Sequence, residues 1–219
     1  MSGNNLIVNN NSRKRRITTP LIALLIAVVI SIAFASVFVY YPMAVTLKPA
    51  QPPVVFVTGS NAGKDDLGDG RNIYVSTGSN GTMLTIEVHP TYRVTYYKNM
   101  SIVYNNDSIK AYQVCFRVES PLSGLPTGSE AYLYIYAASS TRSLSGYPKP
   151  TPSGSLAQIN LMSTEKRCVV TLGGKGYLEM DLYIYIPEGY NVGMESGATY
   201  IANLLLIYTP QTTETPPWT

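Results

Sequence analysis

The sequence predicts an all-β protein, a sandwich or barrel preceded by an N-terminal apolar segment. Charged residues make up only 13%, while the chain has 18 tyrosines, 17 glycines and 15 prolines. Few charges with many aromatic residues and turn formers favour packed strands over a helical bundle. A hydrophobic content of 45% is enough to form a core, which argues against disorder. After residue 50, strand-like segments alternate with turn residues, and no helical period occurs.

Residues 1–35 have the organisation of an export segment. The basic run Arg13–Arg16 precedes an apolar run at 21–35. Without these four basic residues the chain has 12 basic residues against 13 acidic ones, so no basic surface points to nucleic acid. Positive residues before an apolar run stay in the cytoplasm, so we expect the following domain to be extracellular, at the cell surface.

Two interpretations of this segment remain open. As a signal peptide, it has a small-x-small cleavage site at residues 33–35, Ala-Phe-Ala. As an uncut membrane anchor, residues 17–41 supply 25 uncharged residues, enough to span a bilayer. The change of periodicity after residue 35 favours cleavage.

Residues 36–50 have the periodicity of a strand. Every second residue is apolar, which is typical of a strand with one buried face. The apolar positions are Val37, Val39, Tyr41, Met43, Val45 and Leu47. Such an isolated stripe exposes several hundred Å², in the range that marks an interaction site. Pro49, Pro52 and Pro53 then form a stiff, extended linker.

Residues 51–209 form the predicted β-sandwich domain, and residues 210–219 a flexible tail. Turn residues separate its strand candidates at intervals of about 8 to 20 residues, a pattern typical of sandwiches and barrels. The candidates are 53–58, 72–77, 82–88, 92–97, 100–105, 110–119, 131–137, 156–162, 167–172, 177–186 and 200–209.

Two strands alternate clearly and predict an aromatic sheet face. In 131–137 the tyrosines share one side, and in 177–186 the aliphatic residues share one side. The opposite side of 177–186 carries Glu179, Asp181 and two tyrosines. We expect a half-exposed tyrosine face, which either stabilises the sheet through cross-strand pairs or binds subunits or carbohydrate.

Cys115 and Cys168 are expected to form a disulfide, because exported proteins meet an oxidising environment. The bond would close a 53-residue interval and contribute roughly 3–4 kcal/mol. The alternative is a pair of buried free thiols. Neither cysteine has CxxC spacing and His89 is distant in sequence, so no zinc site is expected.

The loop 61–72 gathers three carboxylates, Asp65, Asp66 and Asp69, among glycines. Carboxylates on a flexible loop are ligands that Ca²⁺ prefers. The spacing does not fit an EF-hand, because Leu67 stands where an oxygen ligand is needed. We therefore favour a solvated turn, and expect no metal and no cofactor.

The sequence gives no support for an enzyme. HExxH, GxSxG and GxGxxG are absent, and the single histidine has no second base or nucleophile motif beside it. Three sequons predict glycosylation sites at Asn80, Asn99 and Asn106. Of these, Asn80 lies in SNGT, a typical hairpin turn.

Several short segments resemble those of crenarchaeal surface-filament subunits, the bundling pili and thread filaments of the TasA/camelysin-like family. They are PPVVFVTGSNAG (52–63), DLGDGRNIYV (66–75), EVHPTYRVTYYKNMSIVYNND (87–107) and IYIPEGYNVG (184–193). The resemblance covers about residues 43–209. It implies a single jelly-roll-like (Ig-like) β-sandwich that lacks one strand and is completed by the N-terminal strand of the adjacent subunit, with the chain as its own partner.

The stripe at 37–47 is therefore predicted to be a donor strand, and the protein a structural subunit of an extracellular filament for adhesion or biofilm. Neighbouring filaments are possible partners in bundles, and the membrane is a partner only through residues 1–35. Two alternatives remain. One is a type IV pilin-like subunit with a retained N-terminal helix, and the other a membrane-anchored surface binding module that uses the tyrosine face.

Overall fold

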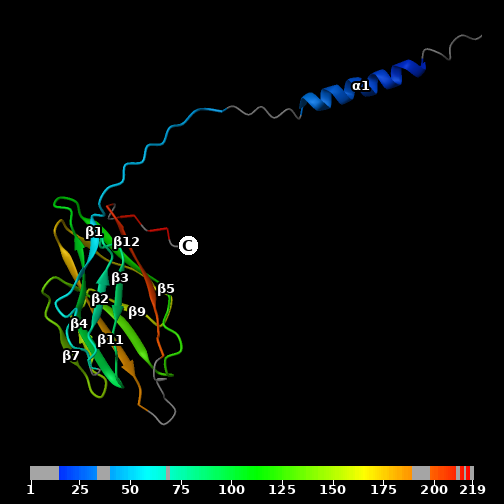
Figure 1. Ribbon diagram of the computed structural model, residues 1–219. Coiled ribbons are helices and arrows are strands. Elements are labelled where there is room, and N and C mark those ends of the chain that lie inside the picture. Colours follow the sequence, from blue (N-terminus) through cyan, green and yellow to red (C-terminus); the bar gives the residue numbers. More distant parts are fainter. Residues whose placement is uncertain are drawn as a thin grey trace, which may run out of the picture. The chain divides into compact units, whose positions relative to one another are not determined.

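Figure 1 shows the computed structural model of the chain, an all-β fold with one N-terminal helix. The structure describes residues 15–33, 40–67, 70–188, 198–210, 213–214 and 216–217. The chain divides into two compact units, Met1–Lys48 and Pro49–Thr219. The first contains the helix and the second all of the strands.

The N-terminal unit contains helix α1 (Arg15–Ala33), in the predicted apolar region. None of the helices in the described ranges is long and apolar enough to cross a membrane. Residues 40–48 follow without helix or strand. The cleavage site expected at 33–35 lies mostly outside the described residues, so cleavage stays a prediction.

The strands of the second unit match the predicted segments closely. They are β1 (Val54–Thr58), β2 (Tyr74–Thr77), β3 (Leu84–Glu87), β4 (Arg93–Asn105), β5 (Tyr112–Ser120), β6 (Glu130–Ala137), β7 (Ser143–Ser145), β8 (Thr151–Ser153), β9 (Ala157–Asn160), β10 (Lys166–Leu172), β11 (Tyr177–Ile186) and β12 (Asn203–Thr209). Two differences stand out. The candidates 92–97 and 100–105 form one strand, β4, and the short strands β7 and β8 were not predicted.

The strands form two main sheets with antiparallel pairing. One has five strands in the order β1-β4-β11-β6-β9, and the other has three in the order β10-β5-β12. Two hairpins, β2-β3 and β7-β8, complete the described strands. The predicted β-sandwich is confirmed.

The two main sheets enclose one hydrophobic core. Alternate residues of the central strands supply it, including Val114, Phe116 and Val118 of β5, each at most 2% exposed. From the facing sheet come Val103 of β4 and Ile135 of β6, both fully buried. Full burial of an aliphatic side chain contributes about 1.5–3 kcal/mol, so these alternate residues stabilise the packing of the two sheets.

A buried amide fixes the end of β4 to a neighbouring turn. The Nδ2 group of Asn105 donates to the carbonyl oxygens of Lys110, Leu172 and Gly173 at 2.8–3.1 Å, and its Oδ1 accepts from the Asp107 backbone N–H. Asn105 is fully buried. The two N–H groups of one side chain are therefore shared among three carbonyl oxygens, which ties the end of β4 to the turn before β5 and to the end of β10.

Candidate functional site

The predicted donor segment is an exposed apolar stripe. Tyr41, Met43, Val45 and Leu47 are 86%, 84%, 69% and 84% exposed, and the segment forms no strand with any described part of the chain. Val37 and Val39 lie outside the described residues. The helix ends at Ala33, so residues 40–48 do not continue it. The segment has the apolar alternation of a strand but no strand partner among the described residues.

The three-stranded sheet ends at β12, where the core is less well covered than elsewhere. Pairing of Leu206 with Phe116 and Leu204 with Val118 places both leucines on the core side of β12. They pack against the core but are only half-buried, whereas their partners on β5 are buried. In the same region Leu205 is 47% exposed and Ile201 63%. The edge of β12 therefore leaves apolar surface in contact with water.

The tyrosine face is more deeply covered than expected: Tyr132 and Tyr185 are half-exposed, but the other three of its tyrosines are buried. Tyr134, Tyr136 and Tyr183 are at most 4% exposed and form a second cluster on the outer side of the five-stranded sheet. The connection between β6 and β9, which contains the β7-β8 hairpin, lies against this cluster. Lys149 from this connection lies 4.4 Å from the ring centre of Tyr185. Burial raises the pKa of Tyr134 and of Tyr183 to about 12.

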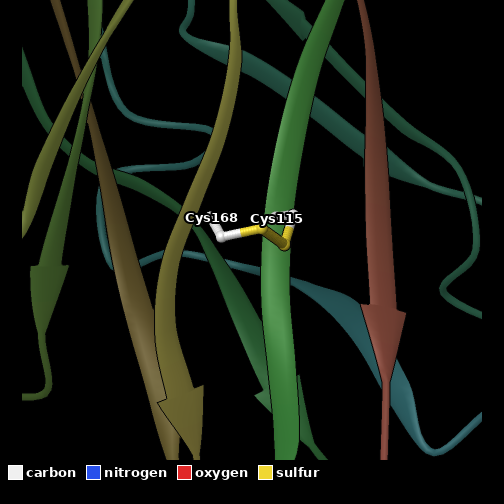
Figure 2. Close-up of a disulfide and its surroundings, with 2 residues drawn as sticks. All are labelled: Cys115 and Cys168. Carbon is white, nitrogen blue, oxygen red and sulfur yellow. A yellow bond between two sulfur atoms is a disulfide. The ribbon is translucent and has the colours of Figure 1, made fainter. Parts of the chain in front are cut away.

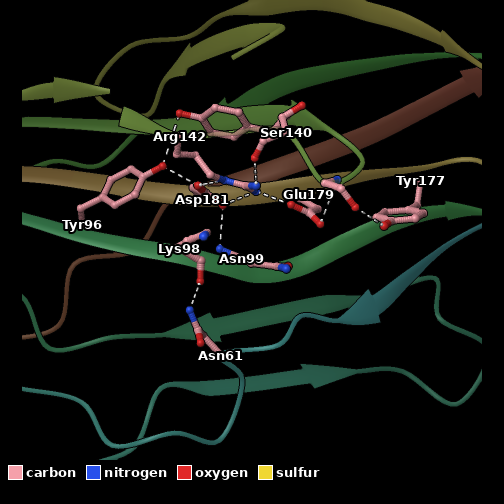
Figure 3. Close-up of polar contacts among 11 residues, drawn as sticks. Asn61, Tyr96, Lys98, Asn99, Ser140, Arg142, Tyr177, Glu179 and Asp181 are labelled. Carbon is pink, nitrogen blue, oxygen red and sulfur yellow. Dashed lines mark hydrogen bonds and ion pairs between the residues drawn. The ribbon is translucent and has the colours of Figure 1, made fainter. Parts of the chain in front are cut away.

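A buried ion cluster fastens this connection to the sheet (Figure 3). Arg142 precedes β7, and its guanidinium contacts Glu179 Oε2 at 2.5 Å and Asp181 Oδ2 at 2.8 Å. It also lies 4.4 Å from the ring centre of Tyr136. The side chains of Arg142, Glu179 and Asp181 are 6%, 9% and 0% exposed. One cation therefore neutralises two carboxylates in a site that excludes water.

Asp181 is the centre of this cluster. It accepts hydrogen bonds from the Tyr96 hydroxyl and, at 2.6 Å, from the Asn99 backbone N–H. Burial and the neighbouring Asp181 raise the pKa of Tyr96, so its hydroxyl remains a donor. Hydrogen bonds to the two carboxylates raise the pKa of Arg142 against the opposing effect of burial. With its carboxylates bound to a permanent cation, the cluster has the character of a structural clamp.

The sequence did not reveal Arg142, which lies in a polar segment without periodicity. The available signal was in β11, where Glu179 and Asp181 interrupt an otherwise apolar and aromatic strand. Carboxylates at such positions are seldom buried without a cation. This pattern predicts that a cation lies nearby, but it does not say which one.

The acidic loop is organised around one aspartate. Asp66 has a fully buried side chain that accepts from the backbone N–H of Leu67 and of His89 and contacts His89 Nδ1 at 2.9 Å. Although burial opposes it, these hydrogen bonds lower the pKa of Asp66. The solvated-turn interpretation is therefore wrong for Asp66. Asp65 is exposed, Asp69 lies outside the described residues, and the described part of the chain contains no group of three or more His, Cys, Asp and Glu placed to hold a metal.

The predicted disulfide is present. Cys115 of β5 and Cys168 of β10 are directly paired in the sheet and bonded to each other, as Figure 2 shows. The bond joins the central strand of the three-stranded sheet to the strand on the side away from β12. It therefore holds β5 in place without engaging the edge of β12.

The three sequons lie in different environments. Asn80 is exposed in the turn between β2 and β3, and Asn106 is exposed after β4. Asn99 is half-buried inside β4, with its backbone bound to Asp181. Glycosylation of all three stays a prediction, and the geometry favours Asn80 and Asn106.

No protein-family model matches this chain. A search of curated proteins gives no match either. The resemblance to crenarchaeal filament subunits therefore stays a prediction, and the functional argument depends on the geometry of the stripe and the sandwich.

Proposed function

We propose that the protein is a structural subunit of an extracellular filament, in which each copy donates its N-terminal strand to the next. The observation that carries this proposal is the alternating stripe at residues 41–47. Its apolar residues are 69–86% exposed in the isolated chain. Exposed apolar stripes of this kind are rare on monomeric proteins and mark interaction sites.

Strand addition explains both the sequence pattern and the exposure. A strand that joins a sheet edge gains main-chain hydrogen bonds, and its alternate side chains enter the core. The four residues at odd positions would enter together, because they share one side of an extended chain. Burial of each would contribute about 1.5–3 kcal/mol.

Self-association by this contact leads to a filament. The donated stripe and the sheet that receives it are different surfaces of the molecule, so the contact is head-to-tail. Head-to-tail contacts generate rings when the rotation closes and open filaments when it does not. A role in adhesion or biofilm at the cell surface is part of this proposal, and it rests on the resemblance to surface-filament subunits; neighbouring filaments would be further partners.

The proposal is tested with the purified full chain by electron microscopy. Val45→Lys should abolish filaments, because it places a charge on the side that enters the core. The matched variant Thr46→Lys introduces the same charge on the opposite side and should leave filaments intact. Removal of residues 36–48 should also abolish filaments. If Val45→Lys and Thr46→Lys behave alike, or if the shortened chain still polymerises, the strand interpretation is wrong.

A second candidate is a type IV pilin-like subunit that keeps its helix as the filament core. It is favoured by α1, whose large apolar residues between Leu21 and Val28 are 52–66% exposed. N-terminal sequencing of the exported protein separates the candidates. A start near Ser36 supports strand donation, a start near Ile17 supports the pilin, and a start at Met1 indicates an anchored chain. The third alternative, a membrane-anchored binding module using the tyrosine face, has less support, because Tyr134, Tyr136 and Tyr183 of that face are buried.

A further inference from the structure

One lateral side of the sandwich is closed by direct contacts between the two main sheets. The edge strands there are β9 and β10. Arg167 of β10 donates to the Gln158 carbonyl of β9 at 3.0 Å. Glu165, just before β10, accepts from the Asn160 backbone N–H at 2.5 Å. These contacts leave no place for an additional strand on this side.

On the opposite lateral side of the sandwich the edge strands are β1 and β12. The β2-β3 hairpin is attached to β1 there. The backbone N–H of Phe56 in β1 donates to the Gly81 carbonyl in the hairpin turn at 2.7 Å. Gly81 has a φ of +65°, and a Cβ there would lie 2.9 Å from the Val55 side chain. The close approach therefore requires glycine. Leu84 and Ile86 of β3 pack against the same core as the main sheets.

Two strands that border the core, β3 and β12, each have an unpaired edge within the described residues. Within the described residues β3 pairs only with β2, and β12 pairs only with β5. Figure 1 shows the β2-β3 hairpin on the side of the sandwich where β12 lies. The core-facing residues of the two strands, Leu204 and Leu206 of β12 and Leu84 and Ile86 of β3, are only half-buried. Within the described residues both strand edges are thus unpaired, and the apolar side chains behind them belong to the same core.

The N-terminal stripe matches this opening in length and in chemistry. Strand β12 has seven residues, as has the segment Tyr41–Leu47. Neither segment contains a charged residue. With its odd positions directed inward, the segment would cover Leu204 and Leu206 and leave Ala44 and Thr46 on the outer side.

We propose that residues 41–47 of a second copy occupy the position between β3 and β12 and pair with the edge of β12. This inference builds on the proposed function and names the receiving surface. The occupant comes from a second copy because the linker after Leu47 is stiff. Pro49, Pro52 and Pro53 fix three of its six residues (48–53) in an extended conformation, which disfavours a turn back to the parent domain.

Paired cysteines in the purified full chain test the inference. Ala44→Cys or Thr46→Cys is combined with Leu205→Cys on β12, or with Thr85→Cys on β3. Two donor positions are used so that either of two neighbouring pairing registers is detected. Both are on the outer side of the segment, because residues paired across two strands lie on the same side of the sheet. The matched control places the second cysteine at Thr171, which is exposed on β10 at the other edge of the same sheet. Products are separated on denaturing gels without reductant.

We expect ladders of cross-linked chains with Leu205→Cys and with Thr85→Cys, and none with Thr171→Cys. Filaments that form without cross-links at β12 or β3 would overturn the receiving site and leave the filament function standing. A bond within a single chain would show that each copy fills its own opening, which would overturn both exchange and the proposed function. Absence of both filaments and cross-links would overturn both proposals as well.

Discussion

Removal of the Arg142 cation should destabilise the protein far more than removal of an exposed arginine. In Arg142→Met the side chain keeps most of its volume and its contact with Tyr136 but loses its charge. Glu179 and Asp181, which are 9% and 0% exposed, are then left without a cation. Two carboxylates in a low-dielectric site are unfavourable unless they are paired.

The expected loss follows from the burial of the cluster. Breaking a buried ion pair by removal of one partner costs about 3–5 kcal/mol. For a domain of this size, 1 kcal/mol shifts the melting temperature by about 2–4 °C, so the shift should be roughly 6–20 °C. The triple variant Arg142→Met, Glu179→Gln, Asp181→Asn should recover much of the loss, because it leaves no buried charge.

The assay is urea and thermal unfolding followed by circular dichroism, with Arg117→Met as the matched control. Arg117 also pairs with a carboxylate, Glu119, at 2.7 Å, but the two side chains are 20% and 46% exposed. Its removal should cost less than about 1 kcal/mol. Equal losses in Arg142→Met and Arg117→Met, or no recovery in the triple variant, would refute the assignment of Arg142 as the clamp of the tyrosine face.

Two further predictions concern pH and the disulfide. Burial raises the pKa of Tyr134 and Tyr183 from 10.0 to about 12, so their contribution to stability is full below pH 10.0 and is lost as the pH rises towards 12. Ultraviolet titration should show tyrosines that ionise only as the fold is lost, and ionisation of every tyrosine near pH 10.0 in folded protein would contradict this. Replacement of both Cys115 and Cys168 by serine should lower the free energy of unfolding by roughly 3–4 kcal/mol. An unchanged urea midpoint would show that the bond does not stabilise the fold.

The strands were predictable wherever alternation extends over a whole strand. The candidate 177–186 coincides with β11, because its aliphatic residues follow a strict two-residue period. Strand β4 was divided in two because Lys98 and Asn99 have the character of a turn. The structure places a bulge there instead. Tyr97 pairs with Leu182 and Ser101 with Met180, so three residues of β4 lie opposite Asp181 alone. The polar pair marked a real irregularity within a continuous strand.

The covered face was not predictable from the same patterns. Alternation placed the tyrosines on one side correctly, but it carries no information about what packs against that side. The hairpin that covers them consists of the segments SLS and TPS, which are too short and too polar to show a period. The candidate stripe, in contrast, could be found by alternation alone, because residues 41–47 have no strand partner within the described ranges and only their order in the chain matters.

The disulfide also has a mechanical consequence. Cys115 and Cys168 are bonded across a sequence separation of 53 residues. The chain segment between them therefore cannot be extended when the two ends of the chain are pulled. An extended chain spans about 3.3–3.6 Å per residue. The disulfide therefore withholds about 180 Å of chain length from extension under tension. The withheld part includes β6 and the connection that carries Arg142. Under tension, the strands of the second unit could thus release chain from β1 to β4, from β11 and β12, and from the outer portions of β5 and β10. Tyr134, Tyr136 and Arg142 lie in the loop that bears no force, whereas Tyr183, Glu179 and Asp181 lie on β11, so the disulfide protects only one side of the clamp from tension.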